Sequence, residues 1–396
     1  MTKILPWWKG MLIGAAAVLL LLLAMATVPM ASAGWNSYKT ITIDGSKVQG
    51  SLTDFPVLIS ITDTDLRDDA QDGGDDILFT NEGNSVKLDH EIEEFDGSTG
   101  DLVAWVRIPS LTSGTSYTLR MWYGNPSCGP QENPEAVWDS NYRMVQHLEE
   151  PEDQTSTDST SYDNDGSVFD DTYVDQNATG KIDGADLFDA LIGRSYIEVP
   201  TSSSLDITGS FTLEAWVNVT TFHASRVDDV ICKNAYGMGI DEGEIVMEVV
   251  HGDHHRTTGA GLTTGTWYYI VAVFDNSADK VYIYLNGSEK LNADETNTPS
   301  ANTNELEIGT CSANKGGKNV DGILDEVRIS ATARDANWIK TSYTNQNDPG
   351  EGGFLSSIGS EVTPESEQPV PELPTLLLFS IGLIALTGYL YVRTHS

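Results

Sequence analysis

The stretch DGILDEVRIS, residues 321–330, has the aliphatic pattern of a β-strand and carries two adjacent carboxylates, Asp325 and Glu326. Side chains along a strand point alternately to its two faces. The alternation predicts that Asp325 shares an apolar face with isoleucine and valine, and that Glu326 points to the other face near Arg328. On opposite faces, the two carboxylates cannot act together as an acid–base pair on one bond.

A carboxylate on an apolar face must accept hydrogen bonds or bind a cation. We therefore expect Asp325 to be a calcium ligand, to be held by hydrogen bonds, or to lie in an exposed bulge. Calcium takes roughly six to eight oxygen ligands, so a second segment must contribute. The predicted source is the turn-rich loop 157–166, with Asp158, Asn164 and Asp165. An ordinary turn rich in Asp and Asn is the alternative for this loop.

The rest of the sequence outlines two β-rich blocks. Short strand-like segments separated by turn residues fill residues 34–127 and again 137–349, with the Pro-rich junction CGPQENPEA between them. This spacing without helical periodicity is typical of β-sandwiches. The fold class predicted is all-β, with two tandem sandwich or jelly-roll domains. One helix, ARDANWIKTSYTN, is expected near residue 340, and the Gly-, Ser-, Glu- and Pro-rich residues 350–374 indicate a flexible stalk.

Both ends of the chain indicate export and anchoring. Residues 1–33 combine lysines, an apolar run and the small residues ASA, which predicts a secretory signal peptide, with an uncleaved anchor as the alternative. Residues 375–392 are nearly uncharged and precede Arg393, as expected of one transmembrane helix whose basic end stays inside. We therefore expect a cell-surface protein that is membrane-anchored at its C-terminus and has extracellular domains.

The composition limits the classes of molecule that could be partners of this chain. With 59 acidic against 22 basic residues, the net charge of −37 argues against nucleic acid and anionic lipid, and favours divalent cations. Of three cysteines, Cys232 and Cys311 fall in the second block and could form a disulfide, which would leave Cys128 over. Glycosylation sequons occur at three asparagines, which agrees with export: Asn177, Asn218 and Asn286.

The first block resembles the DUF2341 family of exported β-domains, through DFPVLISI (54–61), GGDDILFT (73–80) and MWYGNP (121–126). The second resembles laminin-G-like, concanavalin A-like jelly rolls, through FTLEAWVNV (211–219) and the opening stretch. The second resemblance implies a ligand-binding or adhesion domain, often for glycans and often with calcium. The tail VPELPTLLLFSIGLIALTGYLYVRTHS is similar to PEF-CTERM and PEP-CTERM sorting signals, which implies a sortase-type processing enzyme. Simple membrane anchoring remains the alternative.

Motifs for catalysis are weak. Some concanavalin A-like jelly rolls are glycosidases with an E-x-D-x-x-E strand, but the E-x-D at Glu94–Asp96 lies in the first block and is followed by Thr99. No G-x-S-x-G or H-E-x-x-H occurs. The three histidines of HGDHHR (251–256) fit a polar hairpin better than a zinc site. We expect no enzyme activity.

A binding protein is therefore the predicted function, with an extracellular glycan or glycoprotein as partner and calcium as the expected cofactor. Four tryptophans lie inside predicted strands, where core packing is the default: Trp105, Trp122, Trp216 and Trp267. Trp138 and Tyr236 lie nearer to loops and are the candidates for a sugar-stacking surface. The alternatives are a structural envelope component without a soluble ligand and, less favoured, a glycan-active enzyme.

Overall fold

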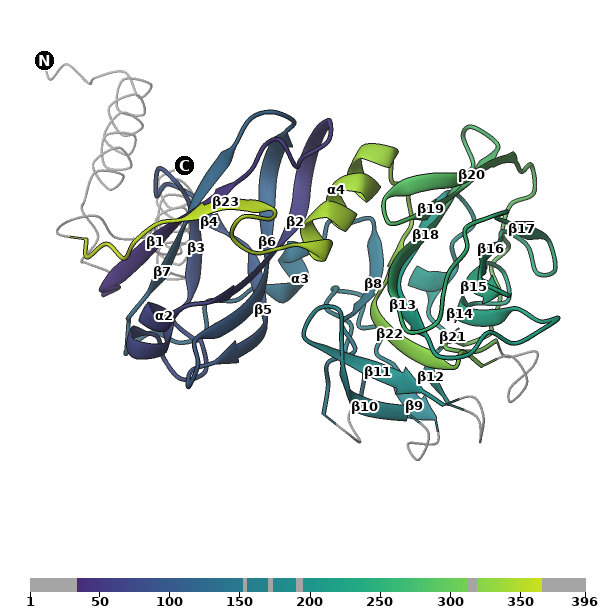
Figure 1. Ribbon diagram of the computed structural model, residues 1–396, viewed down its shortest axis with the longest axis horizontal. Helices are drawn as coiled ribbons and strands as arrows, with labels where there is room; N and C mark the ends of the chain where they lie inside the picture. Colours follow the sequence, from purple (N-terminus) through teal and green to yellow (C-terminus); the bar gives the residue numbers. More distant parts are fainter. Residues whose placement is uncertain (1–33, 152–154, 170–173, 190–194, 312–318, 365–396) are drawn as a thin grey trace, which may run out of the picture.

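The computed structural model describes residues 34–151, 155–169, 174–189, 195–311 and 319–364 (Figure 1). The predicted signal peptide and the membrane or sorting segment lie outside these ranges. Among the described residues, no helix combines the length and the apolar character needed to cross a membrane. Strands dominate, and they form two β-sandwiches, so the predicted all-β fold is confirmed.

The first sandwich packs a five-stranded sheet, in the order β23-β1-β7-β3-β4, against a three-stranded sheet, β2-β6-β5. Its core includes Ile41, Phe79 and Val106. The elements are β1 (Ser37–Ile43), β2 (Ser51–Thr62), α2 (Thr64–Asp69), β3 (Leu78–Asn81), β4 (Lys87–Leu88), β5 (His90–Asp96), β6 (Asp101–Thr112), β7 (Tyr117–Tyr123) and α3 (Pro134–Val137).

The second sandwich packs an eight-stranded sheet, β10-β11-β22-β13-β18-β19-β20 with β8 beside β22, against a seven-stranded sheet, β17-β16-β15-β14-β21-β12-β9. Its elements are β8 (Tyr142–Gln146), β9 (Ser167–Phe169), β10 (Val174–Thr179), β11 (Gly184–Phe188), β12 (Tyr196–Val199), η2 (Ser203–Leu205), β13 (Phe211–Val219), β14 (Asp228–Cys232), β15 (Gly237–Asp241), β16 (Glu244–Glu248), β17 (His254–Arg256), β18 (Trp267–Asp275), β19 (Lys280–Leu285), β20 (Ser288–Asp294), β21 (Leu306–Ile308) and β22 (Gly322–Ser330).

The central strand β13 is buried on both of its faces, apart from the half-buried Asn218. One face contributes Leu213 and Val217 to the core between the two sheets. On the other face, Trp216 packs in a second cluster with Ile339 of the helix α4 (Ala336–Asn347). A strand covered on both sides loses the polar alternation of a surface strand.

The helix α4 lies between the two sandwiches (Figure 1). The amide of Asn345 exchanges hydrogen bonds with the backbone of Leu58 in β2. The next residue, Gln346, accepts a hydrogen bond of 2.7 Å from the indole of Trp216 in the second sandwich. The helix therefore links the facing sheets of both domains.

After α4 the chain returns to the first domain. The strand β23 (Leu355–Ile358) pairs with β1, and Tyr38 and Val362 exchange backbone hydrogen bonds of 3.0 and 2.9 Å. The prediction of a flexible stalk over 350–374 is therefore wrong for its first part. The short segment FLSS has enough apolar and extended character to fill an open sheet edge, where it satisfies backbone groups of β1.

Candidate functional site

The strand β22 contains an irregularity at Glu326. Its backbone has a φ of +54°, and the register with β13 shifts between Trp216–Asp325 and Glu214–Arg328. At the same point the neighbour of β22 changes from β11 to β8. An extra residue in one strand is a β-bulge, and it re-aims the side chains that follow.

The bulge overturns the alternation expected for this strand. Leu324 and Val327 both face the sandwich core, three residues apart instead of two. Asp325, opposite Trp216, and Glu326 therefore lie on the same outer face, next to Arg328. Both carboxylates are completely buried, because this face is covered by the first domain. The prediction of opposite faces was wrong, and with it the reason for excluding cooperation between the two carboxylates.

A buried ion-pair cluster, made of His147, Glu326 and Arg328, occupies this interface. His147 Nδ1 lies 2.9 Å from Glu326 Oε1, and Arg328 Nε donates to Glu326 Oε2 at 3.0 Å. The guanidinium carbon of Arg328 lies 4.2 Å from the ring centre of Trp105, which belongs to the first domain. Cation–aromatic contacts of this kind gain strength when water is excluded.

Glu93 approaches the same cluster from the first domain. It is the extra residue in a bulge of β5, where the register with β6 shifts between Ile92 and Glu94. Its Oε2 accepts a 2.7 Å hydrogen bond from the indole of Trp105 and lies 3.5 Å from His147 Nδ1. Each domain thus has a bulge that places a glutamate at the interface, Glu93 in β5 and Glu326 in β22.

Burial and neighbouring charges set the protonation of these groups. Burial alone would lower the pKa of His147, but Glu326, Glu93 and Glu91 raise that pKa well above its usual value. Burial would raise the pKa of Glu326, and Arg328 and His147 hold it below its usual value instead. Glu326 is thus ionised between two cations. Burial raises the pKa of Glu93 well above its usual value, and the nearby Glu326, Glu149 and Asp325 add to this while His147 opposes it.

Asp325, the predicted calcium ligand, is held by backbone groups of the β10–β11 turn. Its Oδ2 accepts hydrogen bonds from the N–H groups of Lys181 and Ile182, at 2.7 and 2.9 Å. Burial raises the pKa of Asp325 well above its usual value. Among the described residues, three groups of His, Cys, Asp and Glu side chains place ligand atoms within 4.8 Å of one another, and none joins Asp325 to Asp158.

The predicted loop 157–166 is organised around Asp158. The carboxylate of Asp158 accepts hydrogen bonds from the backbone N–H groups of Val145, Thr160 and Asn164, at 2.9 to 3.0 Å, and from the Thr160 hydroxyl. Asp165 Oδ1 in turn accepts from the N–H of Asp158. These contacts match the hydrogen-bonded turn that the sequence left open as the alternative.

Asn164 connects this loop to its surroundings. Its amide nitrogen donates to the carbonyl of Arg143 and to the hydroxyl of Ser204, at 2.5 and 2.9 Å. The loop thereby lies against β8 and η2. Its tip carries the exposed Tyr162, whose ring lies 4.8 Å from the guanidinium carbon of Arg143.

An open hollow of about 690 Å³ begins at this loop. We call it the Tyr162 hollow. Its wall is rich in hydroxyl groups, with one arginine and one aspartate, and it is formed by Arg143, Ser161, Tyr162, Ser202, Ser203, Ser204, Asp206, Ile207, Thr208, Gly209, Ser210 and Ala331. Hydroxyls donate and accept hydrogen bonds, arginine only donates and carboxylate only accepts. An exposed aromatic ring beside such groups suits a polar ligand with apolar C–H faces.

The two aromatic residues predicted to bind sugar are in fact buried. Trp138 is 4% exposed and its indole donates to Glu91 Oε2 at 2.9 Å, inside the domain interface. Tyr236 is 1% exposed and its hydroxyl donates to the carbonyl of Leu205 at 2.9 Å. Both positions looked loop-like because tertiary contacts, and not strand alternation, bury them. Tyr162 was missed, although its place in a turn-rich loop could have drawn attention to it.

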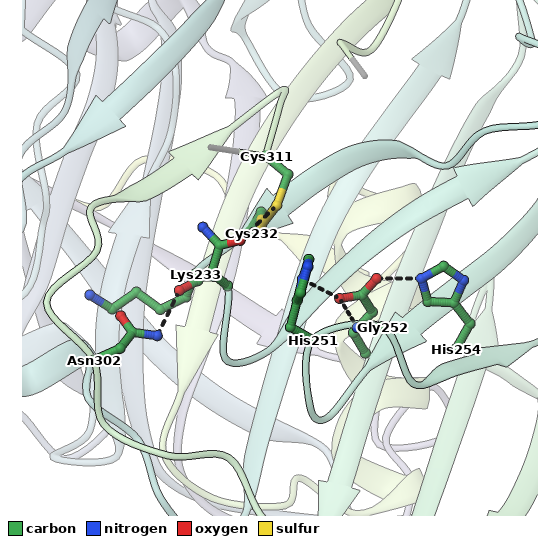
Figure 2. Close-up of a disulfide and its surroundings, with 9 residues drawn as sticks. Cys232, Lys233, His251, Gly252, His254, Asn302 and Cys311 are labelled. Carbon is green, nitrogen blue, oxygen red and sulfur yellow. Dashed lines mark hydrogen bonds and ion pairs between the residues drawn. A yellow bond between two sulfur atoms is a disulfide. The ribbon is translucent and has the colours of Figure 1, made fainter. Parts of the chain in front are cut away.

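The predicted disulfide between Cys232 and Cys311 is present and joins the end of β14 to the segment after β21, with Cys128 left as a thiol (Figure 2). Figure 2 also shows His251 and His254, whose imidazoles approach the carboxylate of Glu248 at 3.6 and 2.5 Å. These histidines lie at the hairpin between β16 and β17. The stretch HGDHHR thus lies in a hairpin, as predicted, and its Asp253 and His255 lie close to Glu295 in one of the three groups with ligand atoms within 4.8 Å of one another.

The three sequons differ in their surroundings. Asn177 lies in β10, and Asn218 is half-buried in β13 between two neighbouring strands. Asn286 is in the turn after β19, where its side-chain oxygen accepts a hydrogen bond of 2.9 Å from the backbone of Tyr269. Glycosylation at these sites stays a prediction.

Comparison with known families supports the division seen in the structure. Residues 191–340 match the sequence model of the concanavalin A-like lectin/glucanases superfamily, Laminin_G_3, and residues 73–172 match DUF2341, a domain of unknown function. The chain thus carries a DUF2341 domain followed by a laminin-G-like domain. The DUF2341 match begins after β2 and continues past the predicted junction through β8 and β9 of the second sandwich. No curated protein sequence matches the chain.

Several solved structures align with about half of the chain. The binding domain of Paraclostridial Mosquitocidal Protein 1 has a TM-score of 0.43 and 16% identity, over 52% of each chain. Domain 4 of AbnA, an extracellular arabinanase from Geobacillus stearothermophilus solved with arabinotriose, has a TM-score of 0.42 and 17% identity, over 51% of this chain and 98% of that one. Trypanosoma rangeli sialidase has a TM-score of 0.42 and 14% identity, over 56% and 35%. The alignment therefore spans about half of the mosquitocidal binding domain and a third of the sialidase.

Proposed function

We propose that this protein is a surface-tethered, non-catalytic glycan-binding protein, and that the Tyr162 hollow of the laminin-G-like domain holds the glycan. The observation that carries the proposal is the exposed ring of Tyr162 beside Arg143 at the rim of a hydroxyl-lined hollow. Sugars present C–H faces that stack on aromatic rings and hydroxyls that need both donors and acceptors. The match to a lectin and glucanase superfamily supports the same ligand class.

The lining of the hollow favours binding over hydrolysis. Glycoside hydrolysis uses a pair of carboxyl groups on either side of the scissile bond. Among the residues that line the hollow, Asp206 is the one carboxylate. The signal peptide and C-terminal anchor expected from the sequence would display the hollow outside the cell.

The site is also held in shape without a ligand. Asp158 fixes the loop that carries Tyr162, and Asn164 ties that loop to Arg143 and Ser204 in the opposite wall. Preformed sites lose less conformational entropy on binding than mobile ones. The arrangement therefore supports recognition by a rigid surface on one side of the laminin-G-like sandwich.

A glycan array probed with the labelled full chain tests the proposal, followed by titration of the best glycan. We expect Tyr162→Ala to weaken binding at least about tenfold, a loss of about 1.4 kcal/mol. Phe169→Ala is the matched control, because Phe169 is an exposed aromatic of the same domain outside the hollow. Equal affinities for the wild type and a folded Tyr162→Ala variant would overturn the assignment of the hollow, and the absence of any retained glycan would overturn the ligand class.

A further inference from the structure

We infer that the interface between the two domains contains a calcium site formed by Glu93 of the DUF2341 domain and by Glu149 and Asp183 of the laminin-G-like domain. We call these three residues the acidic site. One carboxylate oxygen from each residue lies within 4.8 Å of the other two. This inference is independent of the proposed glycan site, and the acidic site contains none of Asp325, Asp158, Asn164 and Asp165.

The balance of charge at the interface motivates the inference. Carboxylates outnumber cations there: the ion-pair cluster supplies His147 and Arg328, which both contact Glu326, and His147 also lies 3.5 Å from Glu91 and Glu93. The carboxylates are Glu91, Glu93, Glu94, Glu149, Asp183, Asp325 and Glu326. Asp325 and Glu91 accept hydrogen bonds from backbone, indole or hydroxyl groups. Glu93, Glu149 and Asp183 form the acidic site, and Glu94 lies against Asp183.

Glu93 supplies a second, independent observation. Its side chain has 0% exposure, and within the described parts of the chain its Oε1 has no hydrogen-bond partner. A buried carboxylate oxygen without a donor costs free energy unless a proton or a cation satisfies it. Glu93 is also the bulged residue of β5, so the local irregularity serves to direct this carboxylate into the interface.

The turn that carries Asp183 is built for a close approach to Glu149. Asp183 has a φ of +46°, and Gly184 follows it directly. A Cβ at Gly184 would come within 2.8 Å of the Glu149 Cα, so only glycine lets the turn pack there. The backbone thus brings Asp183 and Glu149 together, and this requires a left-handed conformation at Asp183 and a glycine at residue 184.

The chemistry of the ligands selects the ion. All the ligand atoms of the acidic site are carboxylate oxygens, which calcium prefers, and three carboxylates with water can complete its coordination. The alternative group of Glu93, His147 and Glu326 already holds two cationic side chains. A metal ion there would face the repulsion of Arg328, whereas none of the described basic side chains forms an ion pair with Glu149 or Asp183.

Terbium luminescence on the chelator-treated full chain tests the site, because terbium takes calcium sites and is excited through nearby indoles. The Trp105 indole donates directly to Glu93, so excitation of tryptophan should yield emission that added calcium displaces. We expect Glu149→Gln and Asp183→Asn each to lower the calcium affinity at least about tenfold. Asparagine tolerates the left-handed backbone of residue 183, so this variant keeps the turn.

Asp158→Asn and Asp294→Asn are the matched controls, one for the loop first predicted to bind calcium and one for an exposed carboxylate. Both should bind calcium as the wild type does. Loss of calcium binding in Asp158→Asn alone, or wild-type affinity in both folded acidic-site variants, would overturn the inference, as would the absence of calcium binding in the wild type. None of these outcomes depends on a glycan, so failure here is distinct from failure of the proposed function.

Discussion

Asp158 and Glu93 are both buried carboxylates in turn-like or irregular backbone, and they have opposite surroundings. Four hydrogen bonds from Val145, Thr160 and Asn164 converge on Asp158, and its carboxylate thereby fixes the shape of a loop. Glu93 accepts one indole hydrogen bond, its Oε1 has no hydrogen-bond partner among the described residues, and the carboxylates of Glu149 and Asp183 lie nearby. A buried acid surrounded by donors acts as structural support, whereas one surrounded by acids requires a proton or an ion.

The largest effect is expected where two buried cations would lose the carboxylate that contacts both of them. Glu326→Gln leaves Arg328 and His147 buried without their shared carboxylate. We expect the free energy of unfolding to fall by about 3–5 kcal/mol, as for other broken buried ion pairs. Chemical denaturation of the full chain measures it. A loss below 1 kcal/mol would mean that neighbouring acids such as Glu93 replace Glu326. Buried carboxylates with donors around them would then not differ in role from those with acids around them.

Removal of the Asp158 carboxylate should lower the free energy of unfolding somewhat less than Glu326→Gln does. Asp158→Ala leaves several backbone N–H groups without an acceptor, and we expect a loss of about 2–3 kcal/mol together with weaker glycan binding. Denaturation and glycan titration on the same preparation check both parts. Unchanged stability would show that the loop holds its shape without the carboxylate and would contradict the role given to Asp158.

The pH dependence of stability tests the acidic site, and the contribution of Asp158, whose pKa burial raises to about 6, falls at lower pH than that of Glu149. Burial raises the pKa of Glu149 from 4.5 to about 8. Because the folded state binds this proton more tightly than the unfolded state, its stabilising contribution is full below about pH 4.5 and is lost as the pH rises through about 8. In chelator, we expect the free energy of unfolding to decline by the order of 1–3 kcal/mol between pH 5 and 9.

Glu149→Gln should flatten that decline, since an amide has no proton to lose. Unfolding curves of both proteins across the pH range provide the comparison. A decline of the same size in the variant would place the responsible group elsewhere in the molecule.

The smallest effect is expected at an exposed carboxylate. Asp294 pairs with Lys280 at the surface, where solvent screens the attraction. Asp294→Asn should leave the unfolding transition unchanged within error. A measurable loss would show that exposure is a poor guide to the roles of the acids in this highly acidic chain.

Alternation of side chains was enough to predict both sandwiches, the helix near residue 340 and the position of β22. It failed at Glu326 because the bulge arises where β22 exchanges β11 for β8, and that exchange depends on strands distant in sequence. Trp138 was misplaced for a similar reason, since it packs in the core cluster of the first domain and its indole donates to Glu91, which is distant in sequence. The loop around Asp158 could be located from its composition, but whether its acids meet a metal or backbone donors depends on β8 and η2.

The return of the chain to β23 affects how tension would pass through a tethered protein. Tyr38 and Val362 lie side by side, so a C-terminal anchor would load the DUF2341 domain. The laminin-G-like domain joins it through two separate connections, one before β8 and one through α4. Force applied to a bound glycan would therefore be carried by the two connections between the domains and by the charged interface between them. An ion bound at that interface would resist sliding of one domain past the other.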